Sequence, residues 1–152
     1  MNVEAIEDKL DIDSMKSIAR GANVIIDCSD NFYTRYALNQ IAYDLKKPLV
    51  SGAAIKFEGQ LSVFDLTSEV SPCYECLFPD AKEEQELRCA DHGVFSPLVG
   101  MIGTAQAAET IKILLSIGSP LVGKLATLDI KTMRWQTFII KKDPHCKVCG
   151  TH

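Results

Sequence analysis

Two C-x-x-C motifs carry the clearest chemical signal in this sequence, one from Cys73 to Cys76 and the other from Cys146 to Cys149. A two-residue gap lets both sulfurs of a knuckle face one ion, and four thiolates suit tetrahedral Zn²⁺. Four protein ligands leave no open coordination position, so the motifs predict a structural zinc site that does not activate water. Four unrelated cysteines or a redox pair remain as alternatives. We expect neither motif to begin a helix directly after a strand, where a redox pair would normally lie.

A run of short polar side chains forms a second candidate site. Residues 27–31 are Asp-Cys-Ser-Asp-Asn and directly follow the apolar run 24–26. In open α/β sheets, ligands bind at the carboxyl ends of the strands, and a carboxylate beside a helix N-terminus suits a metal-bound phosphate group. The alternative is that Asp30 or Ser29 is the N-cap of the following helix, and the spacing alone slightly favours that cap.

Cys89 is a third candidate, because it belongs to neither motif. It lies in the polar, irregular segment 67–93, close to Arg88 and His92, whose positive charge would favour a thiolate. An inert, partly buried thiol is equally consistent with the sequence. We interpret Cys28, by contrast, as a small residue in the core or at the end of a strand.

These candidates need a scaffold, and the hydrophobic pattern predicts an α/β fold. Continuous apolar runs predict strands covered on both faces, and amphipathic stripes predict helices between them. The first half is predicted to alternate as β-α-β-α-β, which implies a parallel sheet with right-handed crossovers. The expected elements are a short strand within residues 1–10, a helix over 11–20 with Asp13 as N-cap and Gly21 as C-cap, a strand over 24–26, a helix over 32–45 and a strand over 49–54.

The second half is predicted to differ from the first. Residues 60–66 alternate and predict an antiparallel strand with one polar face, while 125–130 and 135–140 predict two more strands joined by a turn. Residues 97–117 are almost wholly apolar and predict a long, deeply buried helix, whose glycines allow close packing. The expected fold class is therefore a Rossmann-like mixed α/β sheet, parallel at its start and then antiparallel, with a four-cysteine zinc knuckle.

Length and composition exclude several classes of protein. The chain has 152 residues, which fits one domain, and its 47% hydrophobic and 24% charged residues are typical of a globular protein. A net charge of −4 argues against non-specific binding to nucleic acid or to an anionic membrane. The first eight residues lack a signal-peptide pattern, and the apolar stretch 94–117 carries Glu109 and Lys112, which makes it a poor membrane span. We therefore expect a cytoplasmic protein.

Five segments together resemble the C-terminal part of the ThiF/MoeB/HesA family, the ubiquitin-activating-enzyme-like adenylyltransferases. They follow the family's order and spacing over nearly the whole chain. The segments are DCSDNFYTRYALNQ, KKPLVSGAAIKFEGQLSVF, CYECLFPD, CADHGVFSPLVGMIGTAQAAETIK and CKVCG. The resemblance implies that residues 1–152 are a single domain, the C-terminal part of a ThiF/MoeB-type adenylating domain.

The resemblance also implies an activity and its ligands. Enzymes of this family use ATP and Mg²⁺ to adenylate the C-terminal Gly-Gly carboxylate of a ubiquitin-like sulfur carrier of ThiS or MoaD type, for thiamine or molybdopterin biosynthesis. Asp30 corresponds to the family's Mg-ATP aspartate, and Asn31 corresponds to the residue after it. The resemblance therefore favours a ligand-binding role for Asp30 over the helix cap that the spacing alone slightly favoured. The four motif cysteines correspond to structural zinc ligands. Cys89 corresponds to a crossover thiol that can link covalently to the carrier. Family members are usually dimers, so a homodimer is expected.

One departure from the family bears on activity, because this sequence contains no G-x-G-x-x-G nucleotide loop. We therefore expect the parent protein to be an adenylyltransferase and the isolated chain to be a poor one. The main alternative is a non-catalytic, zinc-pinned docking module that binds a carrier protein but no nucleotide. A thiol-redox protein is a third hypothesis, which a tightly bound, stoichiometric zinc would exclude. The sequence does not separate the thiamine branch from the molybdopterin branch.

Overall fold

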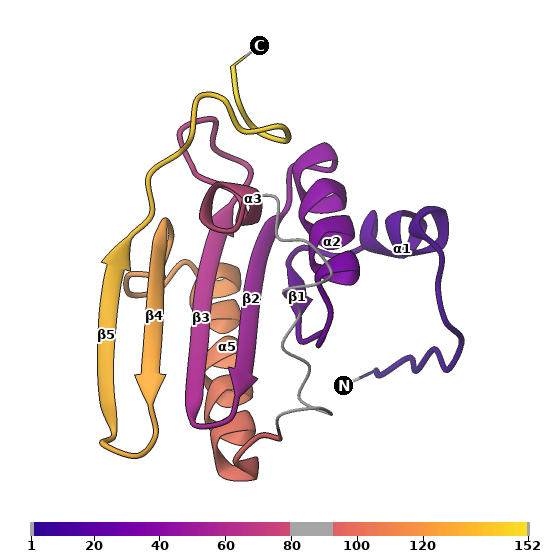
Figure 1. Cartoon of the computed structure of the whole chain (residues 1–152). Helices are drawn as coiled ribbons and strands as arrows, with labels where there is room; N and C mark the ends of the chain where they lie inside the picture. The colour runs from indigo at the N-terminus through magenta and orange to yellow at the C-terminus, as the bar shows by residue number, and fades with distance from the viewer. Residues whose placement is uncertain (1, 80–92, 152) are drawn as a thin grey trace.

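The computed structural model describes residues 2–79 and 93–151, and its centre is a five-stranded sheet in the order β1-β2-β3-β4-β5 (Figure 1). The strands are β1 (Ile25–Asp27), β2 (Pro48–Ile55), β3 (Glu58–Asp65), β4 (Lys124–Asp129) and β5 (Arg134–Ile139). The helices are α1 (Ile12–Ala19), α2 (Phe32–Asp44), α3 (Tyr74–Leu77) and α5 (Ser96–Leu115).

The sheet is mixed, as the sequence predicts. β1 and β2 pair in parallel, with Ile25 opposite Leu49, and α2 makes the crossover between them. The pairs β2–β3, β3–β4 and β4–β5 are antiparallel. Lys56 and Met133 take positive φ angles in the two hairpin turns, β2–β3 and β4–β5. The expected order of a parallel start followed by antiparallel strands is therefore confirmed.

The strand expected within residues 1–10 does not form in the part of that segment that the structure describes. Residues 2–10 contain no strand or helix, leave Val3 and Ile6 exposed, and lie away from the sheet (Figure 1). A few apolar side chains among charged ones are too few to bury one face of a strand. The first half is therefore α-β-α-β, and β1 follows the first helix directly.

The cap of α1 also differs from the prediction. The Asp11 carboxylate accepts a hydrogen bond from the N–H of Ser14 at 2.8 Å, so Asp11 is the N-cap, and Asp13 lies inside the first turn. Arg20 is the C-cap in a right-handed conformation, and Gly21 does not have that role. The difference arises because the helix begins two residues earlier than the apolar stripe suggests, and a cap is defined by that first residue.

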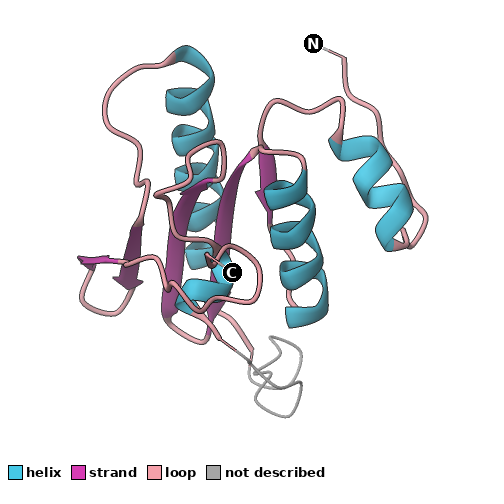
Figure 2. Cartoon of the chain, turned by 90° about the horizontal axis from the view of Figure 1, so that it is seen from above, coloured by secondary structure: helices cyan, strands magenta, loops and turns pink. Residues whose placement is uncertain are grey.

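Helices cover both faces of the sheet (Figures 1 and 2). α5 packs behind β2 and β3, against Val50, Leu61 and Val63. α2 and α3 cover the opposite face, where Leu49 and Phe64 are buried. β3 is thus buried on both faces over much of its length, so the polar face predicted for residues 60–66 is absent there.

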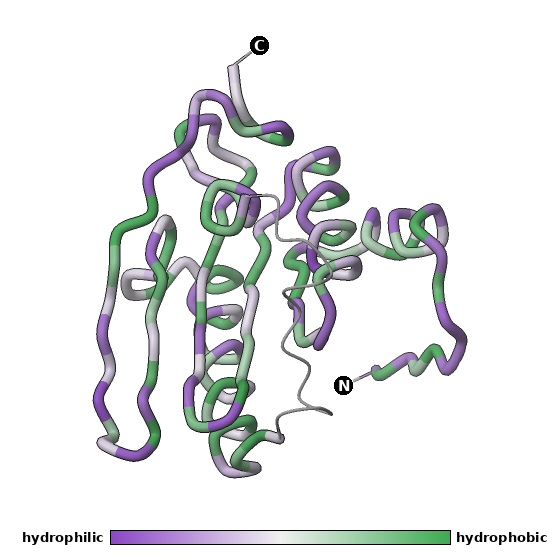
Figure 3. The backbone as a smooth tube through the Cα atoms, viewed as in Figure 1, coloured by the Kyte–Doolittle hydropathy of each residue, from purple (hydrophilic) through white to green (hydrophobic). Residues whose placement is uncertain are grey.

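The long apolar helix is less buried than expected. α5 buries Leu98, Ile102, Gln106 and Glu109, while its other face is exposed, including Leu114. Apolar residues occur along much of the helix (Figure 3). The two glycines of α5, residues 100 and 103, have open space where a Cβ would lie, so they do not serve close packing within the described chain.

α5 is long and apolar enough to cross a membrane by length and composition, and it is the one such helix among the described residues. When only one helix meets this criterion, it is weak evidence that the helix spans a membrane. α5 instead packs along the sheet, and its buried Glu109 forms an ion pair with Lys112 and accepts a hydrogen bond from the N–H of Leu121 at 2.7 Å.

Candidate metal centre and cleft

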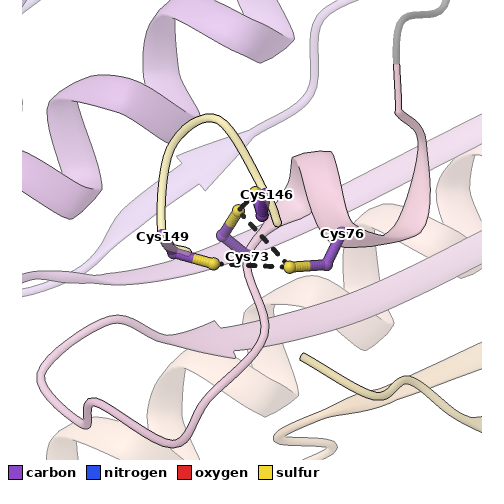
Figure 4. Close-up of side chains that lie close together, drawn as sticks. All are labelled: Cys73, Cys76, Cys146 and Cys149. Carbon is purple, nitrogen blue, oxygen red and sulfur yellow. Dashed lines mark hydrogen bonds between the residues drawn. The ribbon is translucent and has the colours of Figure 1, made fainter. Parts of the chain in front are cut away.

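The four motif cysteines come together in space, although the two motifs are far apart in the sequence (Figure 4). Cys73 is the N-cap of α3 and Cys76 lies in that helix, while Cys146 and Cys149 belong to the C-terminal loop. All four sulfur atoms lie within 4.8 Å of one another. The first motif does begin a helix, but a loop over residues 66–73 separates that helix from β3, so neither motif begins a helix directly after a strand, as expected.

The spacing of the sulfur atoms fits one tetrahedral ion. The Sγ–Sγ distances are 3.5 Å for Cys73–Cys146, 3.3 Å for Cys76–Cys149 and 3.9 Å for Cys73–Cys76. A tetrahedral ion with metal–sulfur bonds of about 2.3 Å would separate its sulfurs by about 3.8 Å. The five cysteines in the described part of the chain are all free thiols. This donor set could therefore hold a metal ion.

The second knuckle depends on a glycine. The N–H of Gly150 donates to the carbonyl of Cys146 at 2.9 Å and closes the turn. A Cβ at position 150 would lie 2.5 Å from that same carbonyl oxygen, so a larger residue would force the turn open. Glycine after the second C-x-x-C is thus a requirement of the turn that brings its two sulfurs to one side.

The thiols oppose simultaneous ionisation unless a cation is present. Burial raises the pKa of the Cys73 thiol to about 12, and burial and the neighbouring thiols also raise the pKa of Cys149. At Cys146 burial acts in the same direction, but the backbone N–H groups of Cys149 and Val148 outweigh it and lower the pKa. The thiolate form is therefore favoured more at Cys146 than at Cys73 or Cys149, and a bound cation would stabilise it at all of them.

A buried ion pair supports the polar loop after β1. Asp27 is almost fully buried, and its carboxylate accepts from Arg35 at 3.3 Å and from the Ser51 hydroxyl at 2.9 Å. Its other oxygen accepts from the N–H of Ser29 at 3.0 Å. The Arg35 guanidinium also donates to the carbonyl of Ser29 and, at 3.3 Å, to that of Gly52. These bonds join α2 to the end of β1 and to β2.

Asp30 is exposed and has no capping role. The N-cap of α2 is Asn31, whose Oδ1 accepts from the N–H of Thr34 at 2.8 Å. The Asn31 amide donates to Asp30 at 3.3 Å and holds that carboxylate beside the helix N-terminus. The capping alternative for Asp30 and Ser29 is therefore wrong, since the neighbouring residue takes that position.

Asp30 lines a cleft of about 510 Å³ at the carboxyl ends of β1 and β2. β1 ends opposite Ser51 whereas β2 continues to Ile55, so the edge of β2 forms one wall of the cleft. The rest of the lining is mainly apolar and comes from α2, β3, α3, α5 and the segments that flank α3 and α5, with residues that include Tyr74, Phe78, Val99, Ile102 and Gly103. Cys28 also lines the cleft; it is exposed and directly follows β1, so of the two interpretations the position at the end of a strand is confirmed and the core position is wrong.

Gln106 of α5 fixes the floor of this cleft. Its amide donates to the carbonyl of Asp27 at 2.7 Å, and its Oε1 accepts from the Cys28 thiol at 3.4 Å. A Cβ at Gly52 would overlap the Gln106 side chain. Glycine at that position is therefore what allows Gln106 to reach the end of β1.

The structure thus brings the four predicted zinc ligands together and places Asp30 and Asn31 at the cleft. Cys89 lies outside the described residues. Sequence reasoning missed Arg35, Asn39 and Gln106, which are polar residues buried on α2 and α5. The feature that could have revealed them is a polar side chain on the core-facing side of a helix. A polar side chain buried there usually has a specific hydrogen-bond partner.

This geometry defines the class: an α/β domain with a ligand cleft at the carboxyl ends of its parallel strands and a four-cysteine cluster beside it. The ThiF family pattern matches residues 1–148. The chain belongs to the ThiF family. It is 40% identical over 150 residues to the molybdopterin-synthase adenylyltransferase of Salmonella typhimurium, and 37% identical over 150 residues to the sulfur carrier protein ThiS adenylyltransferase of Escherichia coli.

Both alignments cover 99% of this chain but only 59% of each relative, so the chain spans little more than half the length of the curated relatives it matches. A crystal structure of E. coli MccB with ATP is similar in fold, with a TM-score of 0.74 over 95% of this chain and 44% of that one. Its sequence identity is 17%, so this likeness concerns the fold alone.

Proposed function

We propose that the parent protein adenylates the C-terminal glycine of a ubiquitin-like sulfur carrier with ATP, for thiamine or molybdopterin biosynthesis. Membership of the ThiF family and the names of two adenylyltransferase relatives support this proposal. The observation that carries it is the position of Asp30. Its carboxylate has no capping role and lies on a cleft beside a helix N-terminus, where phosphate groups bind favourably.

In this proposal Asp30 holds Mg²⁺, with Asn31 fixing the orientation of its carboxylate through the 3.3 Å hydrogen bond. A carboxylic acid activated by adenylation gains a good leaving group, and a cation held by Asp30 would supply positive charge to neutralise the phosphates of the departing pyrophosphate. The network around Asp27 and Arg35 keeps the loop in place while charge develops. Fixed groups of this kind need no reorganisation during the reaction.

The cleft suits an extended tail without side chains. Its strand wall is formed by Gly52, Ala53 and Ala54, and Gly103 leaves the α5 side open. A chain that ends in Gly-Gly could therefore approach the strand edge closely, whereas bulkier residues would meet Phe78 and Ile102. We propose the carrier tail as the occupant, bound between α3 and α5.

We propose that the four motif cysteines bind a structural Zn²⁺ that joins the C-terminal loop to α3. A ligand present at 1,000 times its Kd adds about 4 kcal/mol of stability, and about 1 kcal/mol shifts Tm by roughly 2–4 °C in a chain of this size. Removing the metal with a chelator should thus lower Tm by about 8–16 °C. The Cys146→Ser variant should show the same loss, and Cys28→Ser, which removes an exposed thiol, should not. A chelator without effect on a metal-loaded sample would contradict the proposal.

Further features of the proposal concern the whole chain. We propose that residues 1–152 form one domain, the C-terminal part of an adenylating domain, and that the protein is a cytoplasmic homodimer. Because the sequence has no G-x-G-x-x-G loop, the isolated chain should be a poor enzyme. For Cys89 we propose the role of a crossover thiol: its sulfur would attack the carrier's acyl-adenylate and form a thioester with the C-terminal glycine, while AMP leaves. A Cys89→Ser variant that still forms the same thiol-dependent carrier adduct would contradict that role.

A non-catalytic docking module is the alternative, and two assays with the purified chain separate it from the enzyme proposal. One is ATP–pyrophosphate exchange with Mg²⁺ and carriers ending in Gly-Gly, and the other is calorimetric carrier binding. We expect carrier binding with little or no exchange by the chain alone. Exchange that disappears in Asp30→Ala would show that the chain assembles a working site without the glycine loop. Absence of both exchange and carrier binding would overturn the carrier as substrate.

A further inference from the structure

A buried amide of α2 lacks a hydrogen-bond partner next to the cysteine cluster. Asn39 has no exposed surface, and its Oδ1 accepts from the N–H of Tyr74 at 2.9 Å. Its Nδ2 has no hydrogen-bond partner in the described part of the chain. Buried amide donors are rarely left unsatisfied in folded proteins, because their desolvation is then uncompensated. The orphaned Nδ2 therefore needs an acceptor close to its present position.

The neighbouring sulfur is the acceptor that fits. Tyr74 directly follows Cys73, and Cys73 is the N-cap of α3 but makes no side-chain cap bond. The side chain of Asn39, on α2, accepts the hydrogen bond from the first N–H of α3 instead. This bond holds the Asn39 amide group beside the first C-x-x-C motif. The Asn39 side chain also interacts with the Cys73 sulfur, which is itself fully buried. A neutral thiol is a weak acceptor, whereas a metal-bound thiolate carries negative charge and accepts strongly.

We propose that Asn39 is a positioning residue of the metal centre, which donates a hydrogen bond from Nδ2 to the Cys73 thiolate while Oδ1 caps α3. The proposal rests on the structural metal proposed above. Groups that hydrogen-bond to metal ligands orient them and typically change metal affinity by about 10- to 100-fold when they are removed. Asn39 would act in this way from a different helix, so α2 would be joined to both the cleft loop and the metal centre.

A second buried polar atom offers a matched control. The Ser62 hydroxyl on β3 is the other buried side-chain atom without a hydrogen-bond partner among the described residues. It lies on β3, whereas the four cysteines come from the α3 segment and the C-terminal loop. Ser62→Ala thus removes an unsatisfied buried hydroxyl without changing a residue of the proposed metal centre. Asn39→Asp removes the amide donor but keeps an oxygen that accepts from the N–H of Tyr74.

The test is Co²⁺ binding by the purified chain, followed through thiolate-to-metal charge-transfer absorption, with Zn²⁺ competition to give the zinc affinity. We expect one Co²⁺ per chain in the wild type, a loss of about 10- to 100-fold in affinity in Asn39→Asp, and no change in Ser62→Ala. Circular dichroism checks that each variant is folded. A folded Asn39→Asp variant with wild-type affinity would overturn the role of Asn39 and leave the metal centre standing.

A measurement on the unmodified chain avoids the risk that the variant misfolds. In a sample loaded with ¹¹³Cd²⁺, a hydrogen bond from Asn39 to a cadmium-bound sulfur should give scalar coupling between the side-chain amide proton and the metal. Absence of that coupling in a fully loaded chain would overturn the hydrogen bond. A wild-type chain that binds neither Co²⁺ nor Cd²⁺ would overturn the metal centre itself, and the Asn39 proposal with it.

Discussion

At the scale of single residues, the loop after β1 divides its tasks between neighbours. Asn31 caps α2, Asp27 forms a buried ion pair with Arg35, and Asp30 between them remains exposed at the cleft. The sequence shows this polar cluster but not how the tasks are divided. A shift of one residue in the helix start would make Asp30 the cap, and helix ends are the least certain part of any sequence-based assignment.

The Asp27–Arg35 pair should be essential for stability. Asp27→Ala would leave the Arg35 guanidinium buried and without its carboxylate, and loss of one partner of a buried pair costs about 3–5 kcal/mol. Chemical denaturation followed by circular dichroism should show this loss in the free energy of unfolding. Asp13→Ala, which removes an exposed aspartate of α1, should change it by less than about 0.5 kcal/mol. Equal stability of the two variants would show that the pair is dispensable.

At the scale of elements, α2 connects the two candidate sites. Asn31, Arg35 and Asn39 recur every four residues, so they lie on one side of α2; the first two contact the cleft loop and the third contacts the first C-x-x-C motif. Eight residues of helix span about 12 Å, which sets the separation of these contacts. The sequence predicts this helix from its apolar stripe. It does not predict these contacts, because their partners come from distant segments.

The spacing between β2 and α5 depends on Gly52. Gly52→Ala should displace the Gln106 side chain, weaken its hydrogen bond to the carbonyl of Asp27, and cost about 1–3 kcal/mol of stability. Gly100→Ala on α5 is the matched control, because its Cβ meets open space and alanine is the better helix former. Thermal unfolding should rank Gly52→Ala below the wild type and Gly100→Ala at or above it. The reverse order would refute this account of the cleft floor.

At the scale of the whole molecule, much of the fold could be predicted from the sequence. The strands and helices of the described part lie close to their predicted ranges, apart from the absent strand in residues 2–10 and the short helix α3, which lies in a segment expected to be irregular. The cysteine cluster was predicted because the two-residue gap within each C-x-x-C motif can be recognised in the sequence without knowledge of the packing. The burial of α5 was overestimated, because apolar composition does not show which face has a partner.

The exposed face of α5 should be the surface shared by two copies of the chain. Ile111, Leu114 and Leu115 are each more than half exposed there, which is unfavourable for an isolated monomer. Light scattering should therefore give the mass of a dimer for the wild type and of a monomer for Leu114→Glu. Val70→Glu changes an apolar residue that is 84% exposed elsewhere and should leave the dimer intact. A wild-type chain that is monomeric at all concentrations would contradict the homodimer.

The most direct test of the central claim, that this chain supplies the magnesium-binding carboxylate of an adenylating enzyme, is ATP–pyrophosphate exchange in a chimera. In that chimera this chain replaces the part of the Salmonella relative that it matches. With a carrier ending in Gly-Gly, the chimera should catalyse exchange, Asp30→Ala should lose at least about 100-fold of it, and Asp13→Ala should retain it. An Asp30→Ala chimera that exchanges at the unmodified rate would contradict the account.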